Sequence, residues 1–246
     1  MLLPDRNAII YGGAGTIGRA VARAFAREGA RVHLAGRTLA TLEEAAAEIE
    51  HAGGAVGTAR LDALDEQAVE DHADAVAARS GSIDISINVI SVGEVFGRPL
   101  VELPLADFER PVLMATRSSF LTARAAARHM IHQGSGVILT FGGYGMPLAG
   151  FNLGGFQVAL SAVDALRLQL AAELGPHGIR VLGLQSAGTV EPSEETTMTN
   201  PVVARTMLHR GPTPDDVGNA AAFAASDRAR AMTATALNIT CGAELG

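Results

Sequence analysis

The sequence of 246 residues contains no tryptophan, only two tyrosines and a single cysteine, Cys241. One cysteine excludes an internal disulfide, and we expect Cys241 to be a packed thiol near a subunit contact. Clustered aromatic side chains are missing, which argues against stacking on nucleic-acid bases. An excess of basic residues is missing too. The 19 Lys and Arg residues face 26 Asp and Glu residues, for a formal net charge of −7, so no nucleic-acid partner is expected.

Long hydrophobic runs are also absent. No apolar stretch reaches the length that a bilayer span requires. The first residues, MLLPDRN, contain no basic region followed by a long apolar core, which is the pattern of a signal peptide. We therefore expect no membrane association and a cytoplasmic location. The length fits one α/β domain over residues 1–246, large enough for a substantial core.

A glycine-rich turn between two apolar runs is the most informative stretch. Residues 8–11 predict a buried strand, residues 16–28 an Ala-rich helix that stops at Gly29, and residues 31–35 a second strand. In such a unit Gly12 allows a tight turn, Gly15 lets backbone N–H groups approach a pyrophosphate, and Gly18 allows close helix packing. The positive end of the helix dipole, at Thr16 and Ile17, then faces the phosphates. The stretch predicts a dinucleotide-binding site.

The end of the second predicted strand bears on the choice of dinucleotide. An Asp or Glu at this position usually holds the ribose 2′-hydroxyl of NAD. The sequence here is Ala35-Gly36-Arg37-Thr38, without a carboxylate. Arg37 is placed to pair with a 2′-phosphate, which favours NADP over NAD. The alternative is that Arg37 is a solvated side chain at a strand end.

Strand and helix patterns alternate through the rest of the chain. Helical spacing predicts helices over 38–52, 65–79, 105–132, 156–174 and 213–226, the third of them interrupted or started anew near Pro111. Apolar runs predict strands over 55–61, 83–90, 137–141, 179–185 and 236–239. Alternation of this kind is typical of a Rossmann-type, doubly wound parallel sheet in a single domain.

Several motifs resemble those of short-chain dehydrogenases/reductases, over essentially the whole length. Residues 11–18, YGGAGTIG, resemble the T-G-x-x-G-x-x-G variant of the family's glycine motif. Residues 173–181 are similar to its E-L-x-x-x-G-I-R-V signature, and residues 237–242 to its L-N-V-D-G-G ending. The resemblance implies an NADP(H) site formed by Gly12, Gly15, Thr16, Ile17, Gly18, Arg37, Asp62, Asn88 and Val190.

The catalytic set of that family is a Ser, a Tyr-x-x-x-Lys pair and an Asn. The tyrosine protonates the alkoxide that hydride delivery to a ketone creates. Registered on the E-L-x-x-x-G-I-R-V signature, the tyrosine position falls on Phe156, the lysine position on Leu160 and the serine position on or beside Gly143. The asparagine position falls on Ala115. No lysine occurs in 156–174 at all, so a shifted register does not restore the pair.

Two classes of function remain open at this stage. One is an NADP(H)-dependent oxidoreductase whose proton donor is unusual, or whose substrate, such as an activated alkene or an iminium, needs no strong acid. The other is a catalytically inactive dinucleotide sensor or a partner subunit of an active relative. Tyr144, next to the serine position, is a weak candidate for a relocated proton donor; the alternative is a tyrosine that lines a loop.

No metal site is expected. His129 and His132 lie three residues apart near a helix end, without the Cys or carboxylate pattern of a metal centre. Glu191, Glu194 and Glu195 are interpreted as a solvated loop. The segment 156–174 is apolar over more of its circumference than one sheet contact requires, so it needs a second partner. The resemblance implies that this segment and the segment 105–132 pair across a two-fold axis, giving a homodimer or homotetramer.

Overall fold

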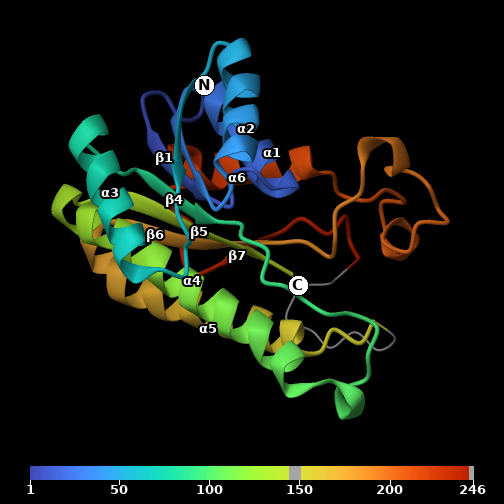
Figure 1. Cartoon of the computed structure of the whole chain (residues 1–246). Helices are drawn as coiled ribbons and strands as arrows, with labels where there is room; N and C mark the ends of the chain where they lie inside the picture. Colours follow the sequence, from blue (N-terminus) through green and yellow to red (C-terminus); the bar gives the residue numbers. More distant parts are fainter. Residues whose placement is uncertain (144–150, 244–246) are drawn as a thin grey trace.

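The computed structural model describes residues 1–143 and 151–243. Its centre is a parallel sheet with the strand order β3-β2-β1-β4-β5-β6-β7 (Figure 1). The strands are β1 (Asn7–Tyr11), β2 (Arg31–Gly36), β3 (Ala55–Arg60), β4 (Ile85–Asn88), β5 (Gly136–Gly142), β6 (Ile179–Gln185) and β7 (Ala236–Asn238). The order reverses direction at β1, next to β4, which is where an open α/β sheet forms its ligand crevice. The predicted doubly wound Rossmann-type fold is confirmed.

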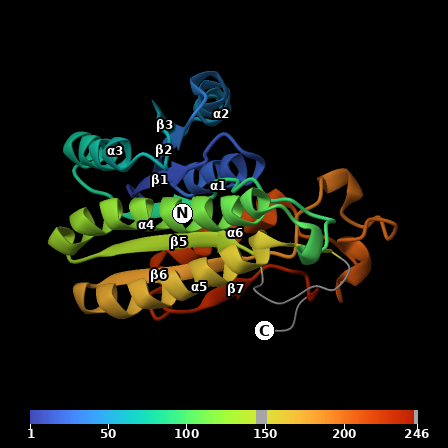
Figure 2. The same cartoon turned by 60° about the horizontal axis from the view of Figure 1, so that its bottom comes forward.

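Helices cover both faces of this sheet. They are α1 (Thr16–Arg27), α2 (Leu39–His51), α3 (Glu66–Ser80), α4 (Leu105–Gln133), α5 (Gly155–Leu174) and α6 (Pro214–Ala225). On one face α1 packs against α6, and on the other α4 packs against α5 (Figure 2). Short 3-10 turns include η1 (Leu100–Glu102), η3 (Pro192–Glu194) and η4 (Val203–Arg205), which lie beyond the carboxyl edge of the sheet.

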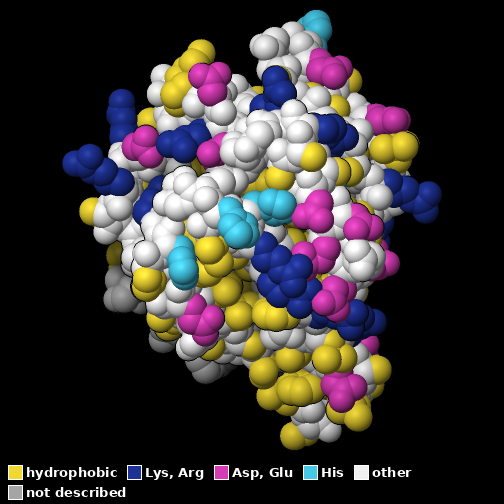
Figure 3. Space-filling model, turned by 90° about the vertical axis from the view of Figure 1, so that its left-hand side faces the viewer, with side chains coloured by type: hydrophobic (Ala, Val, Ile, Leu, Met, Phe, Trp, Pro, Cys, Tyr) yellow, Lys and Arg dark blue, Asp and Glu magenta, His cyan; other side chains and the backbone are white. Residues whose placement is uncertain are grey.

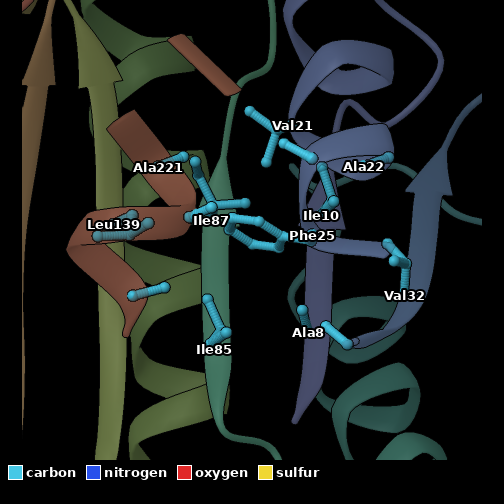
Figure 4. Packing of buried hydrophobic residues seen from close by; sticks show 14 of the residues in the cluster. Ala8, Ile10, Val21, Ala22, Phe25, Val32, Ile85, Ile87, Leu139 and Ala221 are labelled. Atoms are coloured by element: carbon cyan, nitrogen blue, oxygen red, sulfur yellow. The ribbon is translucent and has the colours of Figure 1, made fainter. Parts of the chain in front are cut away.

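Two apolar clusters hold the layers together because successive side chains of a strand point to opposite faces. In β1, Ala8 and Ile10 pack toward α1 and α6, where Phe25 and Ala221 are also buried (Figure 4). The alternate residues Ile9 and Tyr11 join the second cluster, with residues of α3, α4 and α5. The central strands are therefore apolar on both sides.

The long helix α4 differs from the prediction. It is one continuous helix from Leu105 to Gln133, with Pro111 inside it, and neither ends nor restarts there. Pro111 has no N–H to donate to the carbonyl of Asp107, which disfavours a helix. Pro111 is nevertheless buried, and α4 packs along α5 and the central strands. Tertiary packing outweighs the local cost.

Strand β4 is shorter than the predicted 83–90. Before it, the N–H of Ile83 donates to the side-chain Oε1 of Gln133 at 3.0 Å. After it, the N–H of Ile90 donates to Oδ1 of Asn88 at 3.0 Å. Because side chains accept hydrogen bonds from the N–H groups of Ile83 and Ile90, the backbone ladder with the neighbouring strands does not extend to either residue.

The start of α6 is fixed by a cap at Thr213. Thr213 accepts a hydrogen bond from the N–H of Asp216, and the Asp216 carboxylate accepts one from the N–H of Thr213. This reciprocal arrangement fixes the point where the chain enters α6. Within the described ranges, no helix combines the length and the apolar character that a membrane span requires.

Several charged side chains on the surface form ion pairs. Arg124 of α4 donates to Glu66 and Glu70 of α3, at 2.6 and 2.8 Å, and Arg128 donates to Glu70 at 2.5 Å. Figure 3 shows basic and acidic side chains interspersed on the face that it presents. A surface of this kind lacks the one-sided basic stripe of nucleic-acid-binding proteins.

Candidate active site

A cavity of about 800 Å³ opens at the carboxyl ends of β1, β2, β4, β5 and β6. It runs from the glycine turn after β1 to the first half of α5 and the loops after β4 and β6. Seven of the residues predicted to bind the dinucleotide line it: Gly12, Gly15, Thr16, Ile17, Arg37, Asp62 and Asn88. The topology thus brings together residues that are up to 76 positions apart, from Gly12 to Asn88, at one edge of the sheet.

The glycine turn has the shape that a phosphate cradle requires. Gly12 has φ +84°, in the left-handed region that favours glycine. A Cβ on Gly18 would lie 2.2 Å from the carbonyl oxygen of Gly12, so Gly18 lets the first turn of α1 press on the loop. A Cβ on Gly15 would meet only the Gly12 carbonyl oxygen, at 3.4 Å, an ordinary contact. The packing of the protein therefore does not itself require a glycine at 15, and close approach of a ligand does.

The N-terminus of α1 is open to an anion. Gly15 is its N-cap, with no side-chain cap and no acidic residue in the first turn. The first N–H groups of an α-helix have no partner within the helix, and the dipole there is positive. These donors face the cavity through Thr16 and Ile17, which line it. The arrangement fits the pyrophosphate of a dinucleotide.

Arg37 and Asp62 border the far end of the cavity, after β2 and β3. Arg37 is exposed. Asp62 accepts a hydrogen bond from the N–H of Leu64 at 3.0 Å through one carboxylate oxygen. An exposed guanidinium and a partly engaged carboxylate at this end are suited to the adenosine half of the ligand.

Asn88 lies at the cavity, but its side chain forms hydrogen bonds within the protein. Its Nδ2 donates to the Ser118 hydroxyl on α4 at 3.0 Å, and its Oδ1 accepts from Ile90. Asn88 thus ties the end of β4 to α4 and shapes the cavity wall. Two predicted residues lie outside the lining: Gly18, which packs behind the loop, and Val190.

Val190 is buried beneath the loop after β6. Its N–H donates to the carbonyl of Pro212, and its side chain fills the space next to Gly211. The preceding residues, Ser186 to Thr189, line the cavity instead. The loop after β6 thus borders the cavity through these four residues and not through Val190.

The four residues predicted to stand at the family's catalytic positions line the same cavity: Ala115 on α4, Gly143 after β5, and Phe156 and Leu160 on α5. A Cβ on Gly143 would lie 3.1 Å from Cδ1 of Leu160, so Leu160 covers the place where a serine would stand. The ring of Phe156 contacts the ring of Phe96 edge-on, with centroids 5.6 Å apart. These four positions present no hydroxyl, amine or amide side chain to the cavity.

Of the two tyrosines, only Tyr11 belongs to the described residues, and it does not present a proton donor to the cavity. Tyr144 lies outside them. Tyr11 is fully buried, its ring 5.9 Å from that of His72, and its hydroxyl has no hydrogen-bond partner. Burial, with a smaller contribution from the Glu70 carboxylate, raises the pKa of Tyr11 above its usual range. Its hydroxyl is therefore sealed in the core rather than presented to a ligand.

Lysine is absent from the whole chain, because all 19 basic residues counted as Lys and Arg are arginines. No other segment of the protein can therefore supply the ammonium that the family's lysine provides. This count strengthens the inference drawn from the helix 156–174. It was available in the composition from the start.

Three charged residues that the sequence pattern did not single out also line the cavity: Glu94, Asp164 and Arg205. We call the part of the lining that these residues form with Phe96, Phe151 and Phe156 the substrate half. Asp164 accepts two hydrogen bonds from Arg167, at 3.0 and 2.7 Å, and Arg167 lies almost fully buried beside Gly183. The guanidinium of Arg205 lies over the Phe151 ring, 4.8 Å from its centroid. Glu94 lies in the loop after β4 that also carries Phe96.

The remaining candidates lie away from this cavity. His129 pairs with Asp74 at 2.8 Å, and no group of three or more metal-ligating side chains occurs within 1–143 and 151–243. Glu195 pairs with Arg210, which also pairs with Asp216, and these carboxylates raise the pKa of Arg210. Burial raises the pKa of the Cys241 thiol. The Arg210 guanidinium, with Glu195 on one side and Asp216 on the other, ties the loop over 186–211 to the start of α6.

The family model described as Enoyl-(Acyl carrier protein) reductase matches residues 12–244. The chain belongs to the short-chain dehydrogenase/reductase family. It is 28% identical to the 7alpha-hydroxysteroid dehydrogenase of Escherichia coli (strain K12), over 98% of this chain and 94% of that protein. It is 30% identical to the Probable galactose dehydrogenase GalD of Rhizobium meliloti (strain 1021), over 98% of this chain and 95% of that one.

Solved structures agree with this assignment. A putative short-chain dehydrogenase/reductase from Burkholderia xenovorans superposes with a TM-score of 0.89 at 27% identity, covering 98% of this chain and 97% of that chain. Short-chain dehydrogenases/reductases are oxidoreductases that bind a nicotinamide dinucleotide. The glycine cradle, the open end of α1 and the size of the cavity fit this group.

Proposed function

We propose that this short-chain dehydrogenase/reductase is an NADP(H)-dependent oxidoreductase that does not use the Tyr-Lys mechanism of carbonyl reduction. The observation that carries the proposal is the pair Phe156 and Leu160, which line the cavity where the family has its acid and its ammonium. Loss of a general acid alone typically costs about 10²–10⁴ in rate. Substrates that accept hydride without a strong acid escape this penalty.

The preference for NADP rests on Arg37. It is exposed at the cavity end where the ribose 2′ position belongs in this fold, and no carboxylate stands at the end of β2. A guanidinium forms a charge-assisted, bidentate pair with a phosphate. A carboxylate at this position would instead repel the 2′-phosphate.

The residues of the chain have distinct parts in this proposal. Gly12, Gly15 and the first N–H groups of α1 hold the pyrophosphate, and Arg37 holds the 2′-phosphate. The bound NADPH supplies a hydride. Phe156 and Leu160 form an apolar wall that excludes water from the reacting atoms. Asn88, fixed by Ser118, keeps the end of β4 in place beside that wall.

The quaternary structure and location are part of the same proposal. Exposed apolar side chains remain on both α4 and α5, among them Leu113, Phe120, Val158 and Leu168. We propose that these faces pair in a homodimer or homotetramer, and that the protein acts in the cytoplasm, where a lone thiol such as Cys241 stays reduced.

Fluorescence titration with NADPH and NADH tests the cofactor assignment. We expect tighter binding of NADPH, and Arg37→Ala should weaken NADPH binding by about tenfold while NADH binding changes little. Arg228→Ala, an exposed arginine outside the cavity, is the matched control and should change neither. Equal affinities for the two dinucleotides in the unmodified protein would refute the preference. Tight NADPH binding without turnover of any hydride acceptor would instead identify a sensor or a partner subunit.

A further inference from the structure

The charge of the substrate half is the first observation. Asp164 is neutralised by Arg167, and the charge of Arg205 lies over the Phe151 ring. Glu94 has no such neutralisation. Its side chain is half-buried and accepts a 3.5 Å hydrogen bond from the hydroxyl of Ser91, and among residues 1–143 and 151–243 no basic side chain forms an ion pair with it. The cavity therefore holds a carboxylate without a counter-ion.

Aromatic rings in the lining of the same cavity are the second observation. Phe96, two residues after Glu94, meets Phe156 from α5, and Phe151 forms part of the same lining. The faces of aromatic rings attract cations. The protein already uses this property once, since the guanidinium of Arg205 rests on Phe151. A carboxylate without an ion-pair partner and aromatic rings in one cavity are groups that suit an organic cation.

The missing lysine is the third observation. In the family pattern an ammonium stands at the position of Leu160, and it would repel a cationic substrate. Leu160 removes that charge, and no lysine elsewhere in the chain replaces it. The same substitution that disables carbonyl reduction thus makes the cavity more favourable to positive charge.

We propose that the substrate is an iminium cation with an apolar, ring-sized body, reduced to an amine. This inference rests on the proposed NADP(H)-dependent function. The iminium carbon gains the hydride and its two electrons, the C=N π pair moves to nitrogen, and the dinucleotide leaves oxidised. No proton is transferred in this step, so the reaction does not need the acid and the ammonium that Phe156 and Leu160 lack.

We expect Glu94 to strengthen binding of the iminium rather than to accelerate hydride transfer. The positive charge that it attracts is present in the substrate and disappears as the hydride arrives. An interaction of this kind lowers KM without raising kcat. The competing acceptor, an activated alkene, is neutral when bound and becomes a negative enolate, which the Glu94 carboxylate disfavours.

The first experiment measures turnover of NADPH with three acceptors: 2-methyl-3,4-dihydroisoquinolinium, 1-tetralone and 2-cyclohexenone. We expect reduction of the iminium alone, above a blank without protein, with the amine product identified by chromatography. Glu94→Gln should raise KM for the iminium by about tenfold with little change in kcat. Glu102→Gln, an exposed carboxylate of η1 outside the cavity, is the matched control and should change neither.

The second experiment needs no turnover. Calorimetry compares binding of 2,2-dimethyl-1,2,3,4-tetrahydroisoquinolinium with that of its neutral carbon isostere, 2,2-dimethyltetralin, to the protein with oxidised cofactor. We expect the cation to bind about tenfold more tightly, and this ratio to disappear in Glu94→Gln. Because the two probes share a shape, the ratio reports charge alone, and the unmodified protein gives it without any variant.

The outcomes separate this inference from the proposed function. Equal binding of the two probes, or vigorous reduction of 1-tetralone or 2-cyclohexenone with none of the iminium, overturns the inference and leaves an NADP(H)-dependent oxidoreductase. Failure of NADPH to bind overturns the proposed function itself. Preference for the cation with unchanged KM in Glu94→Gln overturns the role assigned to Glu94.

Discussion

Restoring the family's acid and ammonium is the most demanding test of the active-site assignment. Phe156→Tyr alone should not confer ketone reduction, because a phenol with an ordinary pKa of about 10 stays neutral and unassisted beside Leu160. Burial raises the pKa of a phenol further. The double variant Phe156→Tyr, Leu160→Lys supplies both groups and should recover part of the about 10²–10⁴ in rate that a general acid contributes.

The structure limits how much of that rate returns. The methyl carbons of Leu160 stand 3.0 and 3.1 Å from where a Cβ would lie on Gly142 and Gly143, so the side chain at 160 fills this corner. A lysine stem can follow the same path, but Gly143 still offers no hydroxyl to orient a carbonyl. We therefore expect the lower part of the range, about 10²-fold over the single variant.

Partial burial of the new ammonium should also destabilise the protein by about 1–3 kcal/mol. This loss is measured as a lower Tm of the double variant. A folded double variant that does not reduce ketones would show that the chemistry, and not folding, has failed.

The assay is steady-state NADPH oxidation over a panel of ketones. Phe223→Tyr on α6 and Leu39→Lys on α2, both at exposed positions outside the cavity, are the matched controls and should leave ketone reduction at background. Vigorous ketone reduction by the unmodified protein would show that the register is wrong or that another group donates the proton. Equal activity of Phe156→Tyr and the double variant would show that the ammonium is not needed.

Gly18→Ala places a methyl group 2.2 Å from the Gly12 carbonyl and should abolish NADPH binding in a fluorescence titration, while Gly175→Ala, with nothing within 4 Å, should leave binding unchanged. Burial lowers the pKa of both His33 and His72 to about 4. In the unfolded chain these histidines regain a pKa near 6.5, so between pH 6.5 and 4 the unfolded chain binds more protons than the folded protein. Urea titrations should therefore show the free energy of unfolding falling as the pH drops from 6.5 to 4, and a flat profile would contradict this. Light scattering should give a dimer or tetramer, and Leu168→Arg on the exposed face of α5 should shift it toward a monomer with an unchanged circular dichroism spectrum; a monomeric unmodified protein would contradict the assembly.

Much of the fold was predictable because its signals are local. The alternation of apolar runs and helical spacing reflects strands covered on both faces, and the turn at Gly12 needs a left-handed backbone. The cap at Thr213 is a pattern of adjacent residues. Helix α4 was not fully predictable, because Pro111 disfavours a helix locally and only the packing of the whole helix outweighs it.

The candidate site divides in the same way. Positions tied to a motif, such as Phe156 and Leu160, were found by register, and the structure places them at the cavity. Val190 does not line the cavity, because the loop after β6 turns its side chain toward Gly211, which no local pattern reveals. Glu94 was missed because its importance depends on what stands opposite it. A carboxylate in a loop becomes informative only when aromatic rings line the same cavity.

The contact between Phe96 and Phe156 also has an energetic consequence. Phe96 lies between Gly93 and Gly97, both at positive φ, in a loop that otherwise has few constraints, and half of its side chain remains exposed. An edge-on ring pair contributes only about 0.5–1.5 kcal/mol beyond the area that it buries. That free energy is close to the thermal energy, so the ring pair adds little stability to this part of the cavity lining. A ligand that displaces the Phe96 ring from Phe156 therefore loses only this small contribution.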